Sequence, residues 1–214
     1  MSRGAFITLE GSEGAGKSTA LAVIEDWTAG RGLAAEFTRE PGGTQIGERI
    51  RALLLDARQA RMNPMTELML MFAARAQHVR ERIEPALESG RWVICDRFTD
   101  SSHAYQGAGR GMGAGPVDAL AKLAHPELAP DLTLLLDLPV AEGLARARGR
   151  AEPQDRFERE QQAFFERVRL EFLARAEGEP DRFRVIDASR PLAEVTRAIL
   201  AVLEDFHAQR ECAE

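Results

Sequence analysis

Residues 11–18 read Gly11-Ser12-Glu13-Gly14-Ala15-Gly16-Lys17-Ser18, and this stretch decides the fold class. It satisfies the full P-loop pattern and lies between an apolar, strand-like segment, Ala5–Glu10, and a helical pattern that begins near Lys17. Glycines let the backbone curl so that successive amides point inward, and the following helix directs its positive dipole end toward an anion. The stretch therefore predicts a cradle for a phosphate chain rather than an ordinary glycine-rich turn.

The loop residues have separate expected roles. Lys17 is expected to reach the β and γ phosphates of a nucleotide, and the Ser18 hydroxyl to help hold Mg²⁺. Asp96 ends an apolar strand and resembles the acidic residue that organises magnesium in P-loop enzymes, although an aspartate there can also cap a turn. Ser18 and Asp96 are thus the predicted metal ligands. The predicted ATP-binding residues are Gly11, Ser12, Glu13, Gly14, Ala15, Gly16, Lys17, Ser18 and Thr19.

Apolar β-rich segments alternate with longer helical patterns, which is typical of βαβ units. The sequence predicts an α/β fold, a five-stranded parallel sheet flanked by helices, in a single domain over residues 1–214. The expected strands are Ala5–Glu10, Ala34–Thr38, Trp92–Asp96, Leu132–Asp137 and Phe183–Asp187. The expected helices run from Lys17 to Gly30–Gly32 and over Thr44–Leu55, Pro64–Glu88, Gly115–Ala124, Pro139–Arg150, Gln154–Glu177 and Pro191–Gln209.

The segment 145–159 is rich in arginine and contains Gly149 and Pro153. We interpret it as a lid between two helices, with a solvated charged face as the alternative.

Composition limits the possible functions. The net charge of −6 argues against a general nucleic-acid binder, because such binding needs many cations to neutralise phosphates. No apolar run approaches the roughly 18 residues of a membrane span, so no membrane partner is expected. The two cysteines, Cys95 and Cys212, and an N-terminus without a secretion signal favour the reducing cytoplasm. A GTPase switch is disfavoured, because Thr99 replaces the glycine of Asp-x-x-Gly after Asp96 and no Asn-Lys-x-Asp motif occurs.

Four segments in order carry a more specific signal: Thr8–Thr19, Thr38-Arg39-Glu40-Pro41-Gly42-Gly43-Thr44, Asp96-Arg97-Phe98 and Ala104-Tyr105-Gln106-Gly107. Together they make the chain resemble bacterial thymidylate kinases over nearly its whole length. The resemblance implies a P-loop kinase fold and transfer of the γ-phosphoryl group of ATP to dTMP with Mg²⁺. It also implies a homodimer. A kinase for another nucleoside monophosphate and an ATP-binding module without catalysis remain the alternatives.

The same resemblance assigns the acceptor phosphate and the sugar. Arg97 resembles the family arginine that grips the acceptor phosphate, helped by Arg51 and Arg39. Glu13 resembles the carboxylate that accepts a hydrogen bond from the sugar 3′-hydroxyl, and Tyr105 the residue that crowds the 2′ position. Pro41, within the second motif, is also placed in the dTMP site.

The base and the catalytic arginine complete the assignment. Arg75 resembles the residue that hydrogen-bonds a thymine carbonyl, with Ser102 and Gln106 adding contacts and either Met71 or Phe72 covering the ring. Ala15 occupies the position where some members carry a catalytic arginine, so the lid is expected to supply it. The candidates are Arg146, Arg148, Arg150 and Arg156, of which we predict Arg148 and Arg156. Asp187-Ala188-Ser189 resembles an adenine-side loop, with a helix-capping loop as the simpler interpretation.

Overall fold

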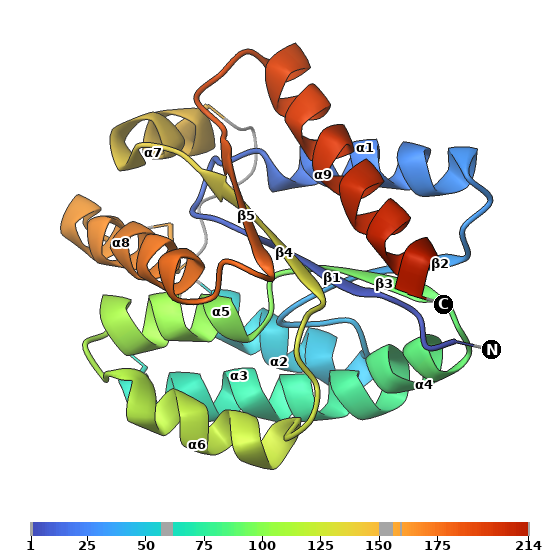
Figure 1. Ribbon diagram of the computed structural model, residues 1–214. Coiled ribbons are helices and arrows are strands. Elements are labelled where there is room, and N and C mark those ends of the chain that lie inside the picture. Colours follow the sequence, from blue (N-terminus) through green and yellow to red (C-terminus); the bar gives the residue numbers. More distant parts are fainter. Residues whose placement is uncertain (1, 57–61, 150–155, 159, 214) are drawn as a thin grey trace.

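The computed structural model describes residues 2–56, 62–149, 156–158 and 160–213. Five parallel strands form one sheet in the order β2-β3-β1-β4-β5 (Figure 1). This confirms the predicted five-stranded parallel sheet: three strands have the predicted bounds, β1 begins one residue later than predicted, and β2 is shifted by one residue. The strands are β1 (Phe6–Glu10), β2 (Ala35–Arg39), β3 (Trp92–Asp96), β4 (Leu132–Asp137) and β5 (Phe183–Asp187).

Helices cover both faces of the sheet, which explains why the strands are apolar runs rather than alternating sequences. Leu134 and Leu136 of β4 pack toward α1 (Lys17–Gly30) and α9 (Leu192–Ala213), whereas Leu135 between them faces α8 (Gln162–Gly178). Successive side chains of a strand point to opposite faces, so each face has its own core. Figure 1 shows α1 and α9 together on one side of the sheet and α3 (Pro64–His78) and α6 (Ala114–Ala124) on the other.

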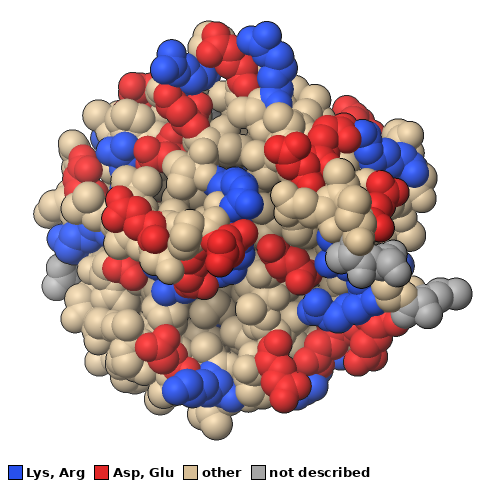
Figure 2. All heavy atoms as spheres, in the orientation of Figure 1, with Lys and Arg blue, Asp and Glu red and all other residues tan. Residues whose placement is uncertain are grey.

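The remaining helical elements lie mostly on the second side. They are α2 (Gln45–Leu55), α3 (Pro64–His78), η1 (Val79–Ile83), α4 (Glu84–Glu88), α5 (Thr99–Ser102), η2 (His103–Gly109), α6 (Ala114–Ala124) and α7 (Val140–Arg148). None of the helices in the described ranges is long and apolar enough to cross a membrane. Figure 2 shows acidic and basic side chains interspersed over the face seen in Figure 1.

The predicted helix over residues 64–88 is one continuous helical run with a π-helical turn, η1, inside it. The amide of Glu84 donates to the carbonyl of Val79, five residues earlier. Pro85 follows directly, and it has no amide proton to donate to the carbonyl of Glu81. The wider turn makes room for the proline ring, which is one of the recognised causes of such bulges in helices.

Two helix predictions were wrong. The segment 99–109, for which no helix was predicted, forms α5 and η2. Its serines, glycines and tyrosine are weak helix formers, and packing against α8 stabilises it, since Arg167 donates to the carbonyls of Ala108 and Gly109. The helix predicted from Gln154 begins only at Gln162: residues 156–158 form a turn, and Gln161 is extended. Of the predicted lid, residues 145–148 belong to α7, while 150–155 and 159 lie outside the described residues.

Candidate active site

The phosphate loop follows β1 and ends where α1 begins. Gly11, Gly14 and Gly16 all have positive φ angles, which only glycine adopts without strain. A Cβ atom on Gly14 would also lie 2.1 Å from the carbonyl oxygen of Gly143 in α7, so this position has no room for a side chain. The sequence therefore folds as a tight loop whose amides lead into the N-terminus of α1, as expected for an anion cradle.

Lys17 crosses this loop, and its ammonium group contacts the loop backbone. Its Nζ atom donates to the carbonyl oxygens of Gly11 at 3.1 Å and Ser12 at 3.3 Å. Burial lowers the pKa of Lys17 to about 8, and the neighbouring charge of Arg97 acts in the same direction. A phosphate group placed in the loop would supply the negative charge that a buried ammonium needs.

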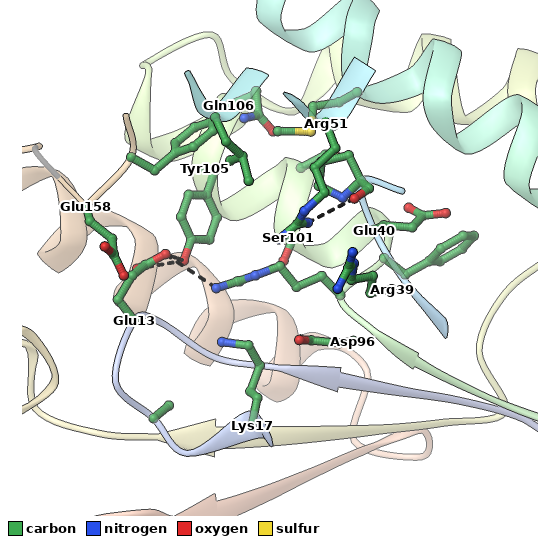
Figure 3. A pocket seen from close by; sticks show the side chains of 18 of the residues that line it. Glu13, Lys17, Arg39, Glu40, Arg51, Asp96, Ser101, Tyr105, Gln106 and Glu158 are labelled. Atoms are coloured by element: carbon green, nitrogen blue, oxygen red, sulfur yellow. Dashed lines mark hydrogen bonds and ion pairs between the residues drawn. The ribbon is translucent and has the colours of Figure 1, made fainter. Parts of the chain in front are cut away.

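A cavity of about 380 Å³ opens beside the loop (Figure 3). It is lined by most of the residues predicted for the acceptor nucleotide, although they come from five elements and three connecting loops. Lys17 and Asp96 lie at one end of the view and Gln106 at the other. The predicted residues that it brings together are Glu13, Gly14, Ala15, Gly16, Lys17, Ser18, Arg39, Pro41, Arg51, Met71, Arg75, Asp96, Arg97, Ser102, Tyr105 and Gln106.

Arg97 follows β3 directly and is the one non-glycine residue with positive φ, 69°, in the described chain. Its guanidinium donates to Ser101 Oγ at 3.1 Å and to Glu13 Oε1 at 3.4 Å. Burial by itself lowers the pKa of Arg97, but Tyr105, Glu13 and Asp96 outweigh it and hold this pKa above its ordinary value. Arg97 is thus a permanent cation with a fixed direction, suited to binding an anion.

Glu10, which the sequence analysis did not single out, supports the Arg97 turn from behind. It is fully buried at the end of β1 and accepts hydrogen bonds from the amide of Phe98 at 2.8 Å and from the hydroxyl of Ser101 at 2.6 Å. Burial, and then the charge of Asp100, raise the pKa of Glu10 to about 7. Because Ser101 also accepts from Arg97, Glu10 orients the guanidinium through one intermediate side chain. The sequence signal that could have identified Glu10 is its position as a carboxylate at the end of an apolar strand, directly before the P-loop.

Asp96 and Ser18 supply the oxygen atoms expected for a hard cation. The Oδ1 atom of Asp96 is buried and has no hydrogen-bond partner among the described residues. Ser18, at the start of α1, is exposed and lines the same cavity. Within the described ranges no three His, Cys, Asp or Glu side chains form a metal cluster. Mg²⁺ binds through one or two protein oxygens plus substrate phosphates, so the side chains of Asp96 and Ser18 could hold it.

At the other end of the cavity, Arg75 of α3 is 3% exposed and held by several acceptors. It donates to Glu40 Oε2 at 2.6 Å, to Ser102 Oγ at 3.1 Å and to the carbonyl of Phe98 at 3.1 Å. Burial raises the pKa of Glu40, but Arg75 and His78 outweigh it and hold this pKa below its ordinary value. Three of the five N–H donors of Arg75 are thereby used, and two remain for a ligand.

The structure distinguishes the two candidates for covering a base. Met71 lines the cavity, whereas Phe72 is buried with Leu68 and Val117 in a cluster below it. One residue along a helix turns the side chain by about 100°, so the two neighbours face different surroundings. Phe98 also lines the cavity, and the sequence analysis gave it no role of its own. The sequence signal that could have identified Phe98 as a cavity residue is its place in the Asp96-Arg97-Phe98 motif.

The lid arginines are placed differently from one another. Arg156 donates to the carbonyl of Leu54 at 2.9 Å and pairs with Glu67 at 2.7 Å, and it does not line the larger cavity, although residues 157 and 158 do. Arg148 is exposed at the end of α7, and Arg150 lies outside the described residues. Arg146 donates to the carbonyl of Ala188 at 3.0 Å. The prediction that Arg148 or Arg156 supplies the catalytic charge therefore stays a prediction.

A second cavity, of about 300 Å³, lies on the opposite side of residues 14–16. It is lined by Thr19 and Val23 of α1, by Arg146, and by Ala188 and Leu192 next to the start of α9. The phosphate loop thus separates two cavities, each large enough for part of a nucleotide. This is the arrangement required to bring a donor and an acceptor phosphate together.

Residues 9–199 match the family model described as thymidylate kinase. The chain belongs to the thymidylate kinase family. It is 57% identical to a thymidylate kinase of Alkalilimnicola ehrlichii over 205 residues, which cover 96% of this chain and 93% of the relative. It is 55% identical to one of Methylococcus capsulatus, with 96% and 98% covered. The crystal structure of thymidylate kinase from Ehrlichia chaffeensis has a TM-score of 0.75 and 31% identity, and covers 94% of this chain and 98% of that one.

Membership of the thymidylate kinase family confirms the resemblance inferred from the four sequence motifs. It also establishes the P-loop kinase fold and a kinase that uses ATP. The two cavities then have a natural interpretation, with the phosphate loop between a donor site and an acceptor site.

Proposed function

We propose that this thymidylate kinase transfers the γ-phosphoryl group of ATP to dTMP, with ATP bound across the second cavity and the phosphate loop and dTMP in the larger cavity. One observation carries this assignment: Arg97, Glu13 and Tyr105 form a connected cluster inside a cavity that begins at Lys17. A monophosphate gripped by Arg97 would lie next to the terminal phosphate of a nucleotide on the loop. The products are dTDP and ADP.

The chemistry is mainly a matter of bringing two anions together. Lys17 binds the β and γ phosphates of ATP, and Arg97, with Arg39 and Arg51, binds the acceptor phosphate. Four cations around the meeting point reduce the repulsion between the phosphates and stabilise the charge on the transferred group. The acceptor oxygen already carries negative charge, so positioning contributes more than proton removal.

Mg²⁺ is the proposed metal, and Ser18 and Asp96 are its proposed protein ligands. The buried, unpartnered Oδ1 of Asp96 supports this role. When bound there, Mg²⁺ would supply positive charge that offsets the charge of the phosphates. Asp96 also lies at the end of β3, directly before Arg97, so one strand end positions both the metal ligand and the acceptor arginine.

The acceptor nucleoside is assigned from the rest of the cavity lining. Glu13 accepts from the sugar 3′-hydroxyl, and the Tyr105 ring closes the space beside the 2′ carbon. At the base, Arg75 uses its remaining donors on a thymine carbonyl, with Ser102 and Gln106 beside it. Met71 covers the ring, supported by its place in the cavity wall.

We further propose a homodimer formed through α2 and α3. These two helices pack against each other and carry four partly exposed apolar side chains: Ile46 and Leu53 on α2, Met65 and Met69 on α3. Residues seven or four apart share one face of a helix, so each pair forms a stripe. Sedimentation of the wild type and of Leu53→Glu tests this, with a dimer expected for the former and a monomer for the latter.

The cytoplasm, where ATP and dTMP are available, is the proposed location.

A coupled kinase assay tests the function. Purified protein with ATP and Mg²⁺ is expected to convert dTMP to dTDP, and Lys17→Ala or Arg97→Ala to lose at least 100-fold in kcat/KM. Parallel reactions with dUMP, UMP, AMP and GMP separate this activity from a kinase for another monophosphate. ATP binding without turnover of any monophosphate would instead identify a non-catalytic module and overturn the proposal.

A further inference from the structure

Glu67 of α3 is a fully buried carboxylate for which the phosphoryl transfer described above has no use. Three side chains from other parts of the chain converge on it. Its Oε1 accepts from Gln106 Nε2 at 2.9 Å and from Arg110 Nε at 3.2 Å, and its Oε2 pairs with Arg156 at 2.7 Å. The two guanidinium groups compensate its buried charge, as a stable buried carboxylate requires.

This contact fixes the orientation of the Gln106 amide. An ionised carboxylate has only acceptor atoms, so the amide nitrogen of Gln106 must face Glu67 and its carbonyl oxygen must point elsewhere. Gln106 is 1% exposed and lines the larger cavity at the end away from Lys17 and Asp96 (Figure 3). The amide oxygen of Gln106 is therefore the atom that can accept a hydrogen bond from a ligand in the cavity.

We propose that Glu67 is a positioning residue that sets the hydrogen-bonding polarity of Gln106 and so selects acceptor bases with a ring N–H. Thymine and uracil carry a hydrogen on N3, which a carbonyl oxygen can accept. Cytosine carries a lone pair at the same atom, and two acceptors facing each other with no donor between them are unfavourable. This inference rests on the proposed binding of dTMP in the larger cavity.

The test is Glu67→Gln, with binding of dTMP and dCMP measured by calorimetry. In the variant the two arginines compete for the single oxygen of the new amide, so its nitrogen turns toward Gln106 and Gln106 reverses. The cavity then presents a donor. The ratio of Kd for dCMP to Kd for dTMP is expected to fall at least tenfold, while the melting temperature reports any loss of stability separately.

Glu160→Gln is the matched control, because Glu160 pairs with the same Arg110 but does not contact Gln106. The Kd ratio of this variant is expected to equal that of the wild type. A second variant, Glu67→Gln with Gln106→Glu, exchanges the two groups and keeps the number of buried charges. Its carboxylate at 106 again offers the base an acceptor, so the preference for dTMP is expected to return, and this variant tests the inference even if Glu67→Gln fails to fold.

Each outcome has one meaning. A Kd ratio unchanged in Glu67→Gln, with both affinities reduced equally, would show a merely structural role and overturn the inference. Loss of dTMP preference in the exchanged variant would overturn it as well. Failure of the proposed function is distinguishable, because then the wild type itself would not bind or phosphorylate dTMP.

Discussion

The hydroxyl of Tyr105 donates to Glu13, lying 2.8 Å from Oε1 and 2.9 Å from Oε2 of that carboxylate. This contact joins η2 to the phosphate loop across 92 residues of sequence. Arg97 also donates to Glu13, at the longer distance of 3.4 Å, so Tyr105 makes the shorter contacts of the two. The position of Glu13, the carboxylate proposed to bind the sugar, therefore depends on Tyr105, which is proposed to shape the same sugar pocket.

Tyr105→Phe removes this hydrogen bond and keeps the ring. We expect the KM for dTMP to rise about five- to tenfold, because one hydrogen bond to a charged group is lost and Glu13 becomes less ordered. Discrimination against the ribonucleotide should stay as in the wild type, since the ring still fills the space beside the 2′ carbon. Steady-state kinetics with both nucleotides measure this, and an unchanged KM for dTMP would contradict it.

The pKa of Lys17, lowered by burial to about 8, predicts a pH dependence. The ammonium form binds phosphates, so kcat/KM for ATP is expected to fall as the pH rises through about 8. At saturating ATP the bound phosphates favour the charged form, and kcat should persist to higher pH.

Lys17→Arg serves as the control, because a guanidinium stays charged throughout this range. Its activity is expected to be lower but independent of pH between 7 and 10. A wild-type profile that stays flat up to pH 10 would mean that Lys17 titrates as an ordinary lysine, contrary to the effect of its burial.

Much of the fold was readable from the sequence because its decisive features are local. Apolar runs bounded by helices identify strands buried on both faces, and three of the five strands have the predicted bounds. The helix over residues 99–109 was not readable in the same way. Its weak helix formers are stabilised by α8, more than 50 residues later, as the bonds from Arg167 show.

In the active site, too, features that are local in sequence could be predicted, whereas contacts between distant segments could not. Motifs identified the cavity lining, since each motif is continuous in sequence. Supporting contacts join distant segments, such as Glu10 with Ser101, 91 positions apart, and no periodicity reports such a pair. The choice between Met71 and Phe72 needed the helix rotation, which depends on how α3 packs against α6.

His103 predicts a separate, pH-dependent effect on stability. Burial, and then the charge of Arg175, lower the pKa of His103 to about 4, while Asp118 acts in the opposite direction. The unfolded histidine binds a proton below about pH 6.5, but the folded one does so only near pH 4. Stability associated with neutral His103 is therefore present above pH 6.5 and lost as the pH falls toward 4.

The neutral variant His103→Gln removes this linkage. Between pH 6.5 and 4, the free energy of unfolding of the wild type is expected to fall by about 3 kcal/mol more than that of the variant. Urea unfolding of both proteins at several pH values measures the difference. Parallel curves for the two proteins would contradict the prediction.

Glu40 and Arg75 form a buried ion pair at 2.6 Å. Glu40→Gln keeps the shape of the side chain but leaves the guanidinium of Arg75 buried without its carboxylate. Breaking a buried pair in this way is expected to reduce the free energy of unfolding by about 3–5 kcal/mol. Because Arg75 lines the cavity at the proposed base site, the KM for dTMP should also rise about tenfold.

Glu84→Gln is the comparison variant, since it removes the pair between Glu84 and Arg80, whose side chain is 67% exposed. Exposed pairs contribute about 1 kcal/mol or less, so this variant should unfold close to the wild type and keep its KM. Denaturant unfolding and dTMP kinetics, measured on both variants, show whether the losses arise from breaking a buried ion pair or from removing a charge at any position. Equal losses of stability would show that water reaches Arg75 when Glu40 is replaced, and an unchanged KM in Glu40→Gln would remove Arg75 from the base site.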